Sequence, residues 1–154
     1  MMAPRHSLSR PARSARPVRS AAGLVGLVLL VVAVLGFVPG VTTGVDEMAF
    51  AGHESGAELF GVFQVSVLHN AVHLLFGAAG VVMSRTAGTA RAFLVGGGFV
   101  YLLLWLYGVL VDLDGDANFV PFDTADNWLH LGLGAAMVLL GVVLGGRRSR
   151  AFGR

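Results

Sequence analysis

The chain has 154 residues, of which 55% are hydrophobic and only 13% are charged, and its mean hydropathy is +0.75. These values exclude an ordinary soluble domain and are typical of a membrane protein. The sequence contains no cysteine, which excludes disulfide bonds, thiolate metal sites and cysteine nucleophiles. The formal net charge is +2, and all eleven basic residues are arginine.

The beginning of the chain joins a basic segment to an apolar one. Residues 1–20 are rich in Arg, Pro and Ser and contain no acidic residue. We expect a disordered leader that contacts anionic lipid headgroups, although an organellar transit peptide has a similar composition. The apolar run 21–38 follows and is just long enough to cross a bilayer. A cleaved signal peptide is the alternative interpretation of this basic leader and apolar run.

Three further apolar runs follow, at about 60–83, 92–111 and 128–146, and a basic tail occupies 147–154. Glycine is frequent within the runs, as membrane helices tolerate. The sequence therefore predicts an all-α, polytopic membrane four-helix bundle over residues 21–146, with the leader and the tail outside it.

Acidic and basic residues alternate between the segments that connect these runs. The loops after the first and third runs, 46–58 and 112–126, hold all nine acidic residues and no arginine. The turn after the second run holds Arg85 and Arg91, and the other arginines lie in the leader and the tail. By the positive-inside rule, we expect a multi-pass protein of the cell membrane with both termini in the cytoplasm.

Two stretches of the sequence resemble each other. NAVHLLFGAA in the second run aligns without a gap with NWLHLGLGAA at the fourth, so that Asn70 matches Asn127 and His73 matches His130. Both copies follow an acidic loop. We therefore predict a pseudo-repeat of two parallel helical hairpins, related by an axis along the membrane normal.

Polar side chains within these runs need a partner or a water-filled space. We predict that they hydrogen-bond across the helices and fix the register of the bundle. One alternative is a proton or solute pathway along the polar face of the second run. Another is a b-type haem held by His73 and His130, or a metal held by them with a carboxylate. The predicted interhelical polar cluster comprises Ser66, His69, Asn70, His73, Asn127 and His130.

Glycines share helix faces with these polar residues. Small residues let membrane helices approach closely, either within the chain or in a homo-oligomer. The predicted helix-packing residues are Gly77, Gly80, Gly97, Gly108, Gly134, Gly141 and Gly145.

The loop after the third run has the acidic spacing of a calcium-binding loop. Its aspartates stand at positions 1, 3, 5 and 12 of such a loop. However, the glycine stands at the wrong position and no flanking EF-hand helix is expected. We interpret the residues as solvated acids and keep a metal site as the alternative. The candidate ligands are Asp112, Asp114, Asp116 and Asp123.

Several of these stretches also carry a family resemblance. Polar residues interrupt the apolar runs at characteristic positions in four motifs. The motifs are FQVSVLHN and VHLLFG in the second run, ANF before the fourth run, and ADNWLHLG at its beginning. Over residues 55–146 they make the chain resemble the domain-of-unknown-function family 4383, a family of small actinobacterial membrane proteins. The resemblance implies a four-span integral membrane protein and supplies no activity, substrate or cofactor.

No catalytic constellation is visible in the sequence. There is no Ser-His-Asp set or phosphate-binding loop, and the four runs contain no acidic residue. We therefore expect a non-enzymatic, structural or interaction component of the membrane, with the lipid bilayer as its partner, no nucleic acid partner and no required cofactor. A small permease or proton-linked transport component is the first alternative, and a haem- or metal-binding membrane protein is the second.

Overall fold

A computed structural model describes residues 15–145 of the chain. Helices make up most of this part, as the sequence predicted. The four α-helices are α1 (Arg16–Leu35), α2 (Val67–Met83), α3 (Ala87–Leu110) and α4 (Thr124–Gly145).

A small antiparallel sheet, which the sequence analysis did not predict, lies between α1 and α2. Its strands pair in the order β1-β2-β3, and a short 3-10 helix precedes β2. These elements are β1 (Thr42–Thr43), η1 (Val45–Glu47), β2 (Ala57–Leu59) and β3 (Phe63–Val65).

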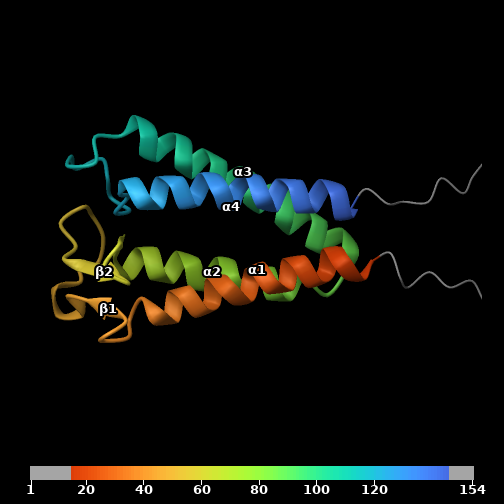
Figure 1. Cartoon of the computed structure of the whole chain (residues 1–154), viewed down its shortest axis with the longest axis horizontal. Helices are drawn as coiled ribbons and strands as arrows, with labels where there is room; N and C mark the ends of the chain where they lie inside the picture. The colour runs from red at the N-terminus through yellow and green to blue at the C-terminus, as the bar shows by residue number, and fades with distance from the viewer. Residues whose placement is uncertain (1–14, 146–154) are drawn as a thin grey trace, which may run out of the picture.

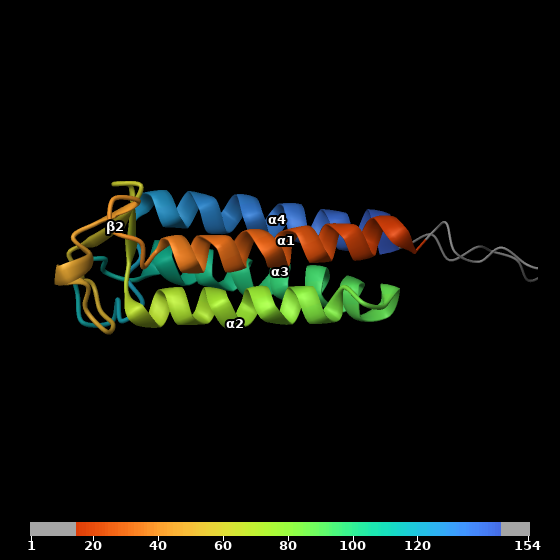
Figure 2. The same ribbon diagram turned by 90° about the horizontal axis from the view of Figure 1, so that it is seen from below.

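The four helices run side by side along the long axis of the molecule (Figures 1 and 2). The closest packing joins α1 to α2, the first pair, and α3 to α4, the second pair. The two pairs meet mainly through α1 and α3. The sheet and the loop between α3 and α4 lie at one end, which we call the loop end. The turn between α2 and α3 lies at the opposite end (Figure 1).

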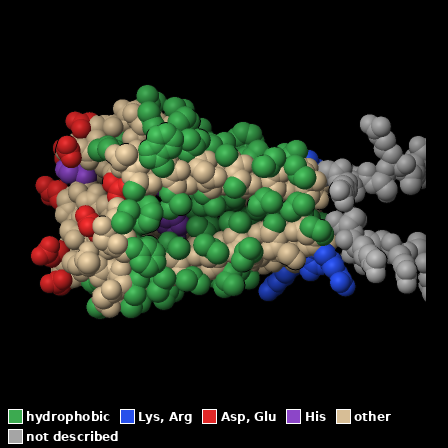
Figure 3. All heavy atoms as spheres, in the orientation of Figure 1, with side chains coloured by type: hydrophobic (Ala, Val, Ile, Leu, Met, Phe, Trp, Pro, Cys, Tyr) green, Lys and Arg blue, Asp and Glu red, His purple; other side chains and the backbone are tan. Residues whose placement is uncertain are grey.

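The outer surfaces of the helices are apolar. Helices α1, α3 and α4 are long and apolar enough to cross a membrane, whereas α2 is apolar but shorter, with 17 residues. Only 22–33% of the most apolar window of each long helix is buried inside the protein. In Figure 3, acidic side chains gather at the loop end, arginines at the opposite end and hydrophobic side chains between them. These features are those of a membrane protein.

The first two helices begin at other residues than the sequence predicts. α1 begins at Arg16, so residues 16–20 are helical and the prediction of a disordered leader was wrong for them. α2 begins at Val67 and not near residue 60. The reason is a tight turn between β2 and β3, in which Phe60 and Gly61 adopt φ angles of 57° and 66° that a helix does not allow.

The last two helices begin earlier than predicted. Thr86 caps α3 by accepting a hydrogen bond from the backbone N–H of Thr89, so that α3 begins at Ala87. α4 begins at Thr124 and therefore includes Asp126, which corrects the expectation that the spans contain no acidic residue. Residues 1–14 and the tail 147–154, with their arginines, lie outside the described residues.

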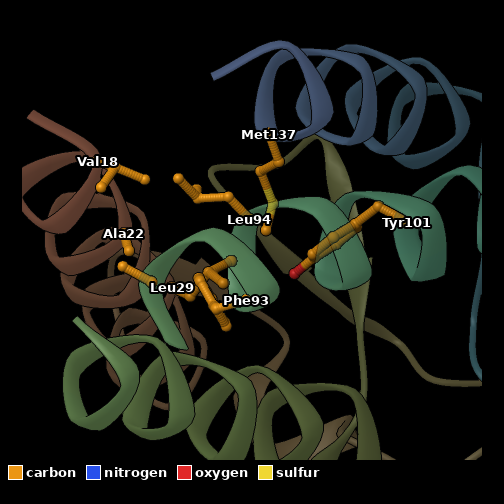
Figure 4. Packing of buried hydrophobic residues seen from close by; sticks show 8 residues of the cluster. Val18, Ala22, Leu29, Phe93, Leu94, Tyr101 and Met137 are labelled. Carbon is orange, nitrogen blue, oxygen red and sulfur yellow. The ribbon is translucent and has the colours of Figure 1, made fainter. Parts of the chain in front are cut away.

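The main core joins three of the helices. Val18, Ala22 and Leu29 of α1 face Phe93, Leu94 and Tyr101 of α3, and Met137 of α4 reaches between them (Figure 4). Ala90 completes this cluster.

Glycines set the distance between the helices of each pair. A Cβ atom added to Gly26 would lie 2.8 Å from the carbonyl oxygen of Gly77 in the first pair. In the second pair, a Cβ atom on Gly98 would lie 2.8 Å from the carbonyl oxygen of Gly134. Both pairs are therefore packed through close backbone contacts that a larger residue would prevent.

The predicted packing glycines all lie at such contacts. A Cβ atom added to any of them would come within 3.0 Å of an atom of a neighbouring helix. These glycines are Gly77, Gly80, Gly97, Gly108, Gly134, Gly141 and Gly145.

The two segments at the loop end are tied together. Gln64, which the sequence analysis placed in a helix, lies in β3, and its side-chain amide donates to the carbonyl oxygens of His53 and Ser55 at 2.7 and 2.8 Å. Its backbone N–H donates to Asp123 Oδ2 at 2.8 Å. The sheet is thereby attached to the beginning of α4.

Candidate functional site

Three histidines and one tyrosine lie together between the two helix pairs, near the loop end. His69 and His73 of α2 are stacked, with ring centroids 4.5 Å apart. The ring of Tyr101 on α3 lies 6.4 Å from that of His73 and 5.4 Å from that of His130 on α4. The structure thus brings the two equivalent histidines of the predicted repeat to one site, which we call the histidine site.

The first turn of α2 positions two of these histidines. Ser66 caps the helix, because its Oγ accepts a hydrogen bond from the backbone N–H of His69 at 3.1 Å. His69 and His73 are one turn apart and therefore share a helix face. His73 Nδ1 lies 3.2 Å from the carbonyl oxygen of His69, so the second ring is held by the backbone of its own helix.

Asp123 positions the third histidine in a similar way. Its Oδ1 accepts a hydrogen bond from the backbone N–H of Asp126 at 2.8 Å, as an N-terminal cap does. The preceding loop is fixed by Asn118, whose amide donates to the carbonyl oxygens of Leu113 and Phe122. Asn118 Oδ1 in turn accepts from the backbone N–H of Phe122 at 2.9 Å. The Phe122 ring lies 5.3 Å from that of His130 and covers it.

Four buried polar atoms around this region have no hydrogen-bond partner among the described residues. A buried polar atom without a partner costs roughly 1–3 kcal/mol and calls for an explanation. Two of them belong to rings of the histidine site, which are only 5% and 3% exposed. The four atoms are His69 Nδ1, His130 Nδ1, Asp126 Oδ2 and Asn127 Oδ1.

A cavity of about 190 Å³ opens at the histidine site. Its mouth lies between α2 and α3, where Val72 and Val100 are 45% and 43% exposed on the apolar surface. Four of its lining residues are the aromatic and imidazole rings of the site, and the others are apolar. The complete lining is His69, Val72, His73, Phe76, Val100, Tyr101, Leu104, Val120, Phe122 and His130.

A second, narrower cavity of about 80 Å³ shares the three histidines. Its other walls come from α1, α4 and the sheet, and they include the buried carboxyl group of Asp126. Figure 3 shows histidine atoms in the furrow between the two helix pairs. The three imidazoles therefore border both cavities.

The other members of the predicted polar cluster lie apart from the histidines. Asn127 Nδ2 donates to the carbonyl oxygen of Gly108 at 3.0 Å and so links α4 to α3. Asn70 Nδ2 lies 3.9 Å from Met48 Sδ, and its amide fills the space left by Gly36 at the end of α1. The predicted bonds between the two Asn-x-x-His units do not form among the described residues. Each asparagine instead packs against a glycine of its own helix pair.

Sequence reasoning missed two residues of this region. Tyr101 was not among the residues predicted for the polar cluster, although its ring lies beside those of both His73 and His130. Asp126 was assigned to a solvated loop because the apolar run begins only at Trp128. The signal for its helical position was Asp123, which stands three residues earlier, as an N-terminal cap does.

Two of the four candidate calcium ligands, Asp112 and Asp123, accept hydrogen bonds from backbone groups. Asp112 Oδ1 accepts a hydrogen bond from the backbone N–H of Asp114 at 3.2 Å. Both oxygens of Asp123 accept from backbone N–H groups, those of Gln64 and Asp126. Within residues 15–145, no group of three or more His, Asp or Glu side chains has an arrangement that holds a metal ion.

The histidine site lies within the part of the chain that a family model matches. The family is described as Domain of unknown function (DUF4383), and its model matches residues 19–143. The chain belongs to this family. The resemblance to it that the sequence suggested is thus confirmed, and membership assigns no activity. No curated protein and no solved structure matches the sequence.

Proposed function

We propose that the protein is a four-span integral protein of the cell membrane with both termini in the cytoplasm, and that it acts as a structural or interaction component. The apolar outer faces of the helices support a position in the bilayer. The gathering of acids at the loop end and of arginines at the other end supports the orientation (Figure 3). Its partners are the lipid bilayer and, near the arginines, anionic headgroups.

Helix α2 is short for a membrane span. Its 17 residues extend about 26 Å at a rise of 1.5 Å per residue, compared with a hydrocarbon core of about 30 Å. A bilayer accommodates a difference of this size by thinning locally. The close packing of α2 along α1 supports a span that crosses with its neighbour.

We also propose that the four-helix bundle is a pseudo-repeat of two parallel hairpins, α1–α2 and α3–α4. The contacts of the two pairs correspond residue by residue. A Cβ atom on Gly77 would meet Gly26 O and Leu30 N, and one on Gly134 would meet Gly98 O and Leu102 N. The difference in residue number between corresponding residues of α1 and α3 is constant. The same holds for α2 and α4, with a different value.

The pattern of burial supports the same correspondence. Most buried positions of the first pair have a buried counterpart in the second pair. Between α1 and α3 the counterparts are Val18/Ala90, Ala22/Leu94, Gly26/Gly98 and Leu29/Tyr101. Between α2 and α4 they are His69/Asp126, Asn70/Asn127, Gly77/Gly134 and Gly80/Met137.

One observation carries the proposed structural role: the buried asparagines pack against glycines of the same chain. Asn70 occupies the space beside Gly36, and Asn127 occupies the equivalent space beside Gly108. These contacts fix the register of each hairpin without a bound group. A homo-oligomer would therefore use other surfaces than these glycine faces.

An absorption spectrum and a metal analysis of the purified protein test this proposal. We expect no Soret band and no stoichiometric metal, because the ring of Tyr101 lies against those of both His73 and His130 where a haem would need space. A Soret band that disappears in His73→Ala or His130→Ala would contradict the structural role and support haem binding.

A proton-linked transport component is the second candidate, and the carboxyl group of Asp126 beside the three histidines favours it. Protonatable side chains within membrane helices often mark proton pathways. The test is proton flux into vesicles that contain the wild-type protein or His130→Phe. His53→Phe, which changes a histidine of the loop between η1 and β2, is the matched control. Flux that His130→Phe abolishes and His53→Phe preserves would establish this second function.

A further inference from the structure

The larger cavity at the histidine site presents almost only carbon to a bound molecule. Most of its lining side chains are aliphatic or aromatic, and none is Asp, Glu or Arg. The unpartnered Nδ1 atoms of His69 and His130 are buried, and nearly all of the surface inside the cavity is apolar. A buried water molecule needs two to four polar partners, and apolar cavities in other proteins stay dry. The cavity therefore takes an apolar occupant.

The mouth of the cavity opens on the outer surface of the helices. The cavity lies between α2 and α3, which pack less closely than the two members of a helix pair. Val72 of α2 and Val100 of α3 flank the mouth and are partly exposed. Towards the loop end, Val120 and the buried ring of Phe122 line the cavity. In a bilayer, the mouth therefore faces the acyl chains of the lipids.

The cavity has room for a short piece of such a chain. Its volume is about 190 Å³. For comparison, an engineered apolar cavity of about 150 Å³ in another protein binds benzene. By this comparison, the cavity holds a segment of roughly seven carbon atoms, and the rest of the chain remains in the bilayer.

The depth of the cavity indicates which lipids reach it. His73 lies about 9 Å along α2 from its beginning at Val67, at a rise of 1.5 Å per residue. In a hydrocarbon core of about 30 Å, this depth belongs to the leaflet at the loop end. The chains of that leaflet surround the mouth at the concentration of a pure phase. Mass action therefore favours them over any dissolved apolar molecule.

We propose that the cavity binds one acyl chain of a phospholipid from the leaflet at the loop end. The chain enters between Val72 and Val100. It lies against Phe76 and Tyr101 and fills a space whose lining would otherwise lack van der Waals contacts. The bound chain is thus part of the packing between the two helix pairs. This lipid site requires the membrane position proposed above.

Photochemical labelling of the full-length protein in vesicles tests the proposal. The probe is a phosphatidylcholine with a diazirine in the middle of one acyl chain, and mass spectrometry locates the labelled residues. We expect label on Tyr101 and Phe122, which line the cavity and are only 4% and 2% exposed. Leu75 of α2 and Leu103 of α3, which are 71% and 65% exposed, report contact with the surrounding lipid.

The pattern of label separates failure of the lipid site from failure of the membrane position. Label on Leu75 and Leu103 without label on Tyr101 or Phe122 would overturn the lipid site alone. No label on any of the four residues would contradict the membrane position, and the lipid site with it. A phospholipid with the diazirine in its head group is the control and is expected to leave Tyr101 and Phe122 unlabelled. Equal labelling of these two residues by both probes would overturn the assignment to an acyl chain.

Two variants of α3 locate the entrance. Val100→Trp fills the mouth and is expected to abolish the label on Tyr101 and Phe122 without changing that on Leu75. Phe99→Trp introduces the same side chain at a neighbouring exposed position that does not line the cavity, and it is expected to be labelled like the wild type. Wild-type labelling of Tyr101 in Val100→Trp would contradict the assigned entrance.

Discussion

The two helix pairs are alike in the middle of the molecule and different at the loop end. In the middle, Gly26 meets Gly77 as Gly98 meets Gly134, through the same backbone atoms. At the loop end, the first pair is joined through a three-stranded sheet and the second through a loop organised by Asn118. The two pairs are therefore alike where their helix backbones are in contact, and they differ at the loop end, where side chains form the histidine site.

This contrast accounts for the asymmetry of the histidine site. A close helix contact tolerates only small residues, so the glycines of the two pairs correspond. The position of His69 in α2 is taken by Asp126 in α4, although both are buried. The two helix pairs thereby supply three histidines and one carboxyl group to the site.

The largest predicted effect concerns the shared glycine contacts. Gly98→Leu is expected to lower the free energy of unfolding in detergent by about 3 kcal/mol, because its side chain would meet the backbone of Gly134. Gly26→Leu is expected to have a similar effect in the first pair. Gly96→Leu is the control, because a Cβ atom there meets nothing within 4 Å. If either Gly98→Leu or Gly26→Leu were as stable as the wild type, the two pairs would not share the same close backbone packing.

The two asparagines are expected to differ. Asn127→Ala removes the hydrogen bond to the carbonyl oxygen of Gly108, which lies in the last turn of α3 where carbonyls lack helical partners. We expect a loss of about 2 kcal/mol in thermal or denaturant unfolding. Asn70→Ala loses only a weak contact with Met48 Sδ and is expected to cost less. A larger loss for Asn70→Ala would reverse the assignment of these roles.

The caps of α2 and α4 allow a finer comparison. Ser66→Ala is expected to destabilise the protein by about 1 kcal/mol, the usual cost of losing an N-terminal cap. Asp123→Ala is expected to cost about 2 kcal/mol, because Asp123 also accepts a hydrogen bond from the backbone N–H of Gln64. Equal losses for the two variants would show that the bond to Gln64 contributes nothing.

The smallest effect is a stabilisation confined to the first pair. Phe60 has a φ of 57°, which is unfavourable for a residue with a side chain, and 58% of its surface is exposed. Phe60→Gly is expected to raise the free energy of unfolding by about 0.5 kcal/mol, after the lost contacts of the ring are deducted. Val62→Gly is the matched control in the same turn and is expected to destabilise. A loss of stability in Phe60→Gly would show that the ring matters more than the backbone.

The sequence was sufficient for the features that depend on hydropathy and small residues. The apolar runs follow from composition, the candidate packing glycines from their helix faces, and the predicted correspondence of His73 with His130 from the alignment of two stretches. It did not reveal the sheet or the start of α2, because the apolar residues Phe60, Val62 and Phe63 continue the apolar run of the helix toward the N-terminus. A backbone turn at Phe60 and Gly61 keeps the helix from extending back to residue 60, and mean hydropathy does not detect such a turn.

The composition of the histidine site was also only partly predictable. His69, His73 and His130 were recognised because polar residues are costly in apolar runs. Tyr101 looks like an ordinary packing residue in the sequence, and only the packing of α3 beside α2 and α4 brings it to the site. The roles of Asn70 and Asn127 could not be assigned either, because they depend on glycines far away in the chain.

The membrane path of α2 is the central claim, and thiol labelling tests it most directly. The chain contains no cysteine, so single cysteines can replace the exposed residues Glu54, Arg85 and Asp116 without background. In intact cells, a membrane-impermeant thiol reagent is predicted to label the cysteines at 54 and 116, and to label that at 85 only after permeabilisation. Equal labelling at 54 and 85 in intact cells would mean that α2 does not cross the membrane, and would contradict the two-hairpin account.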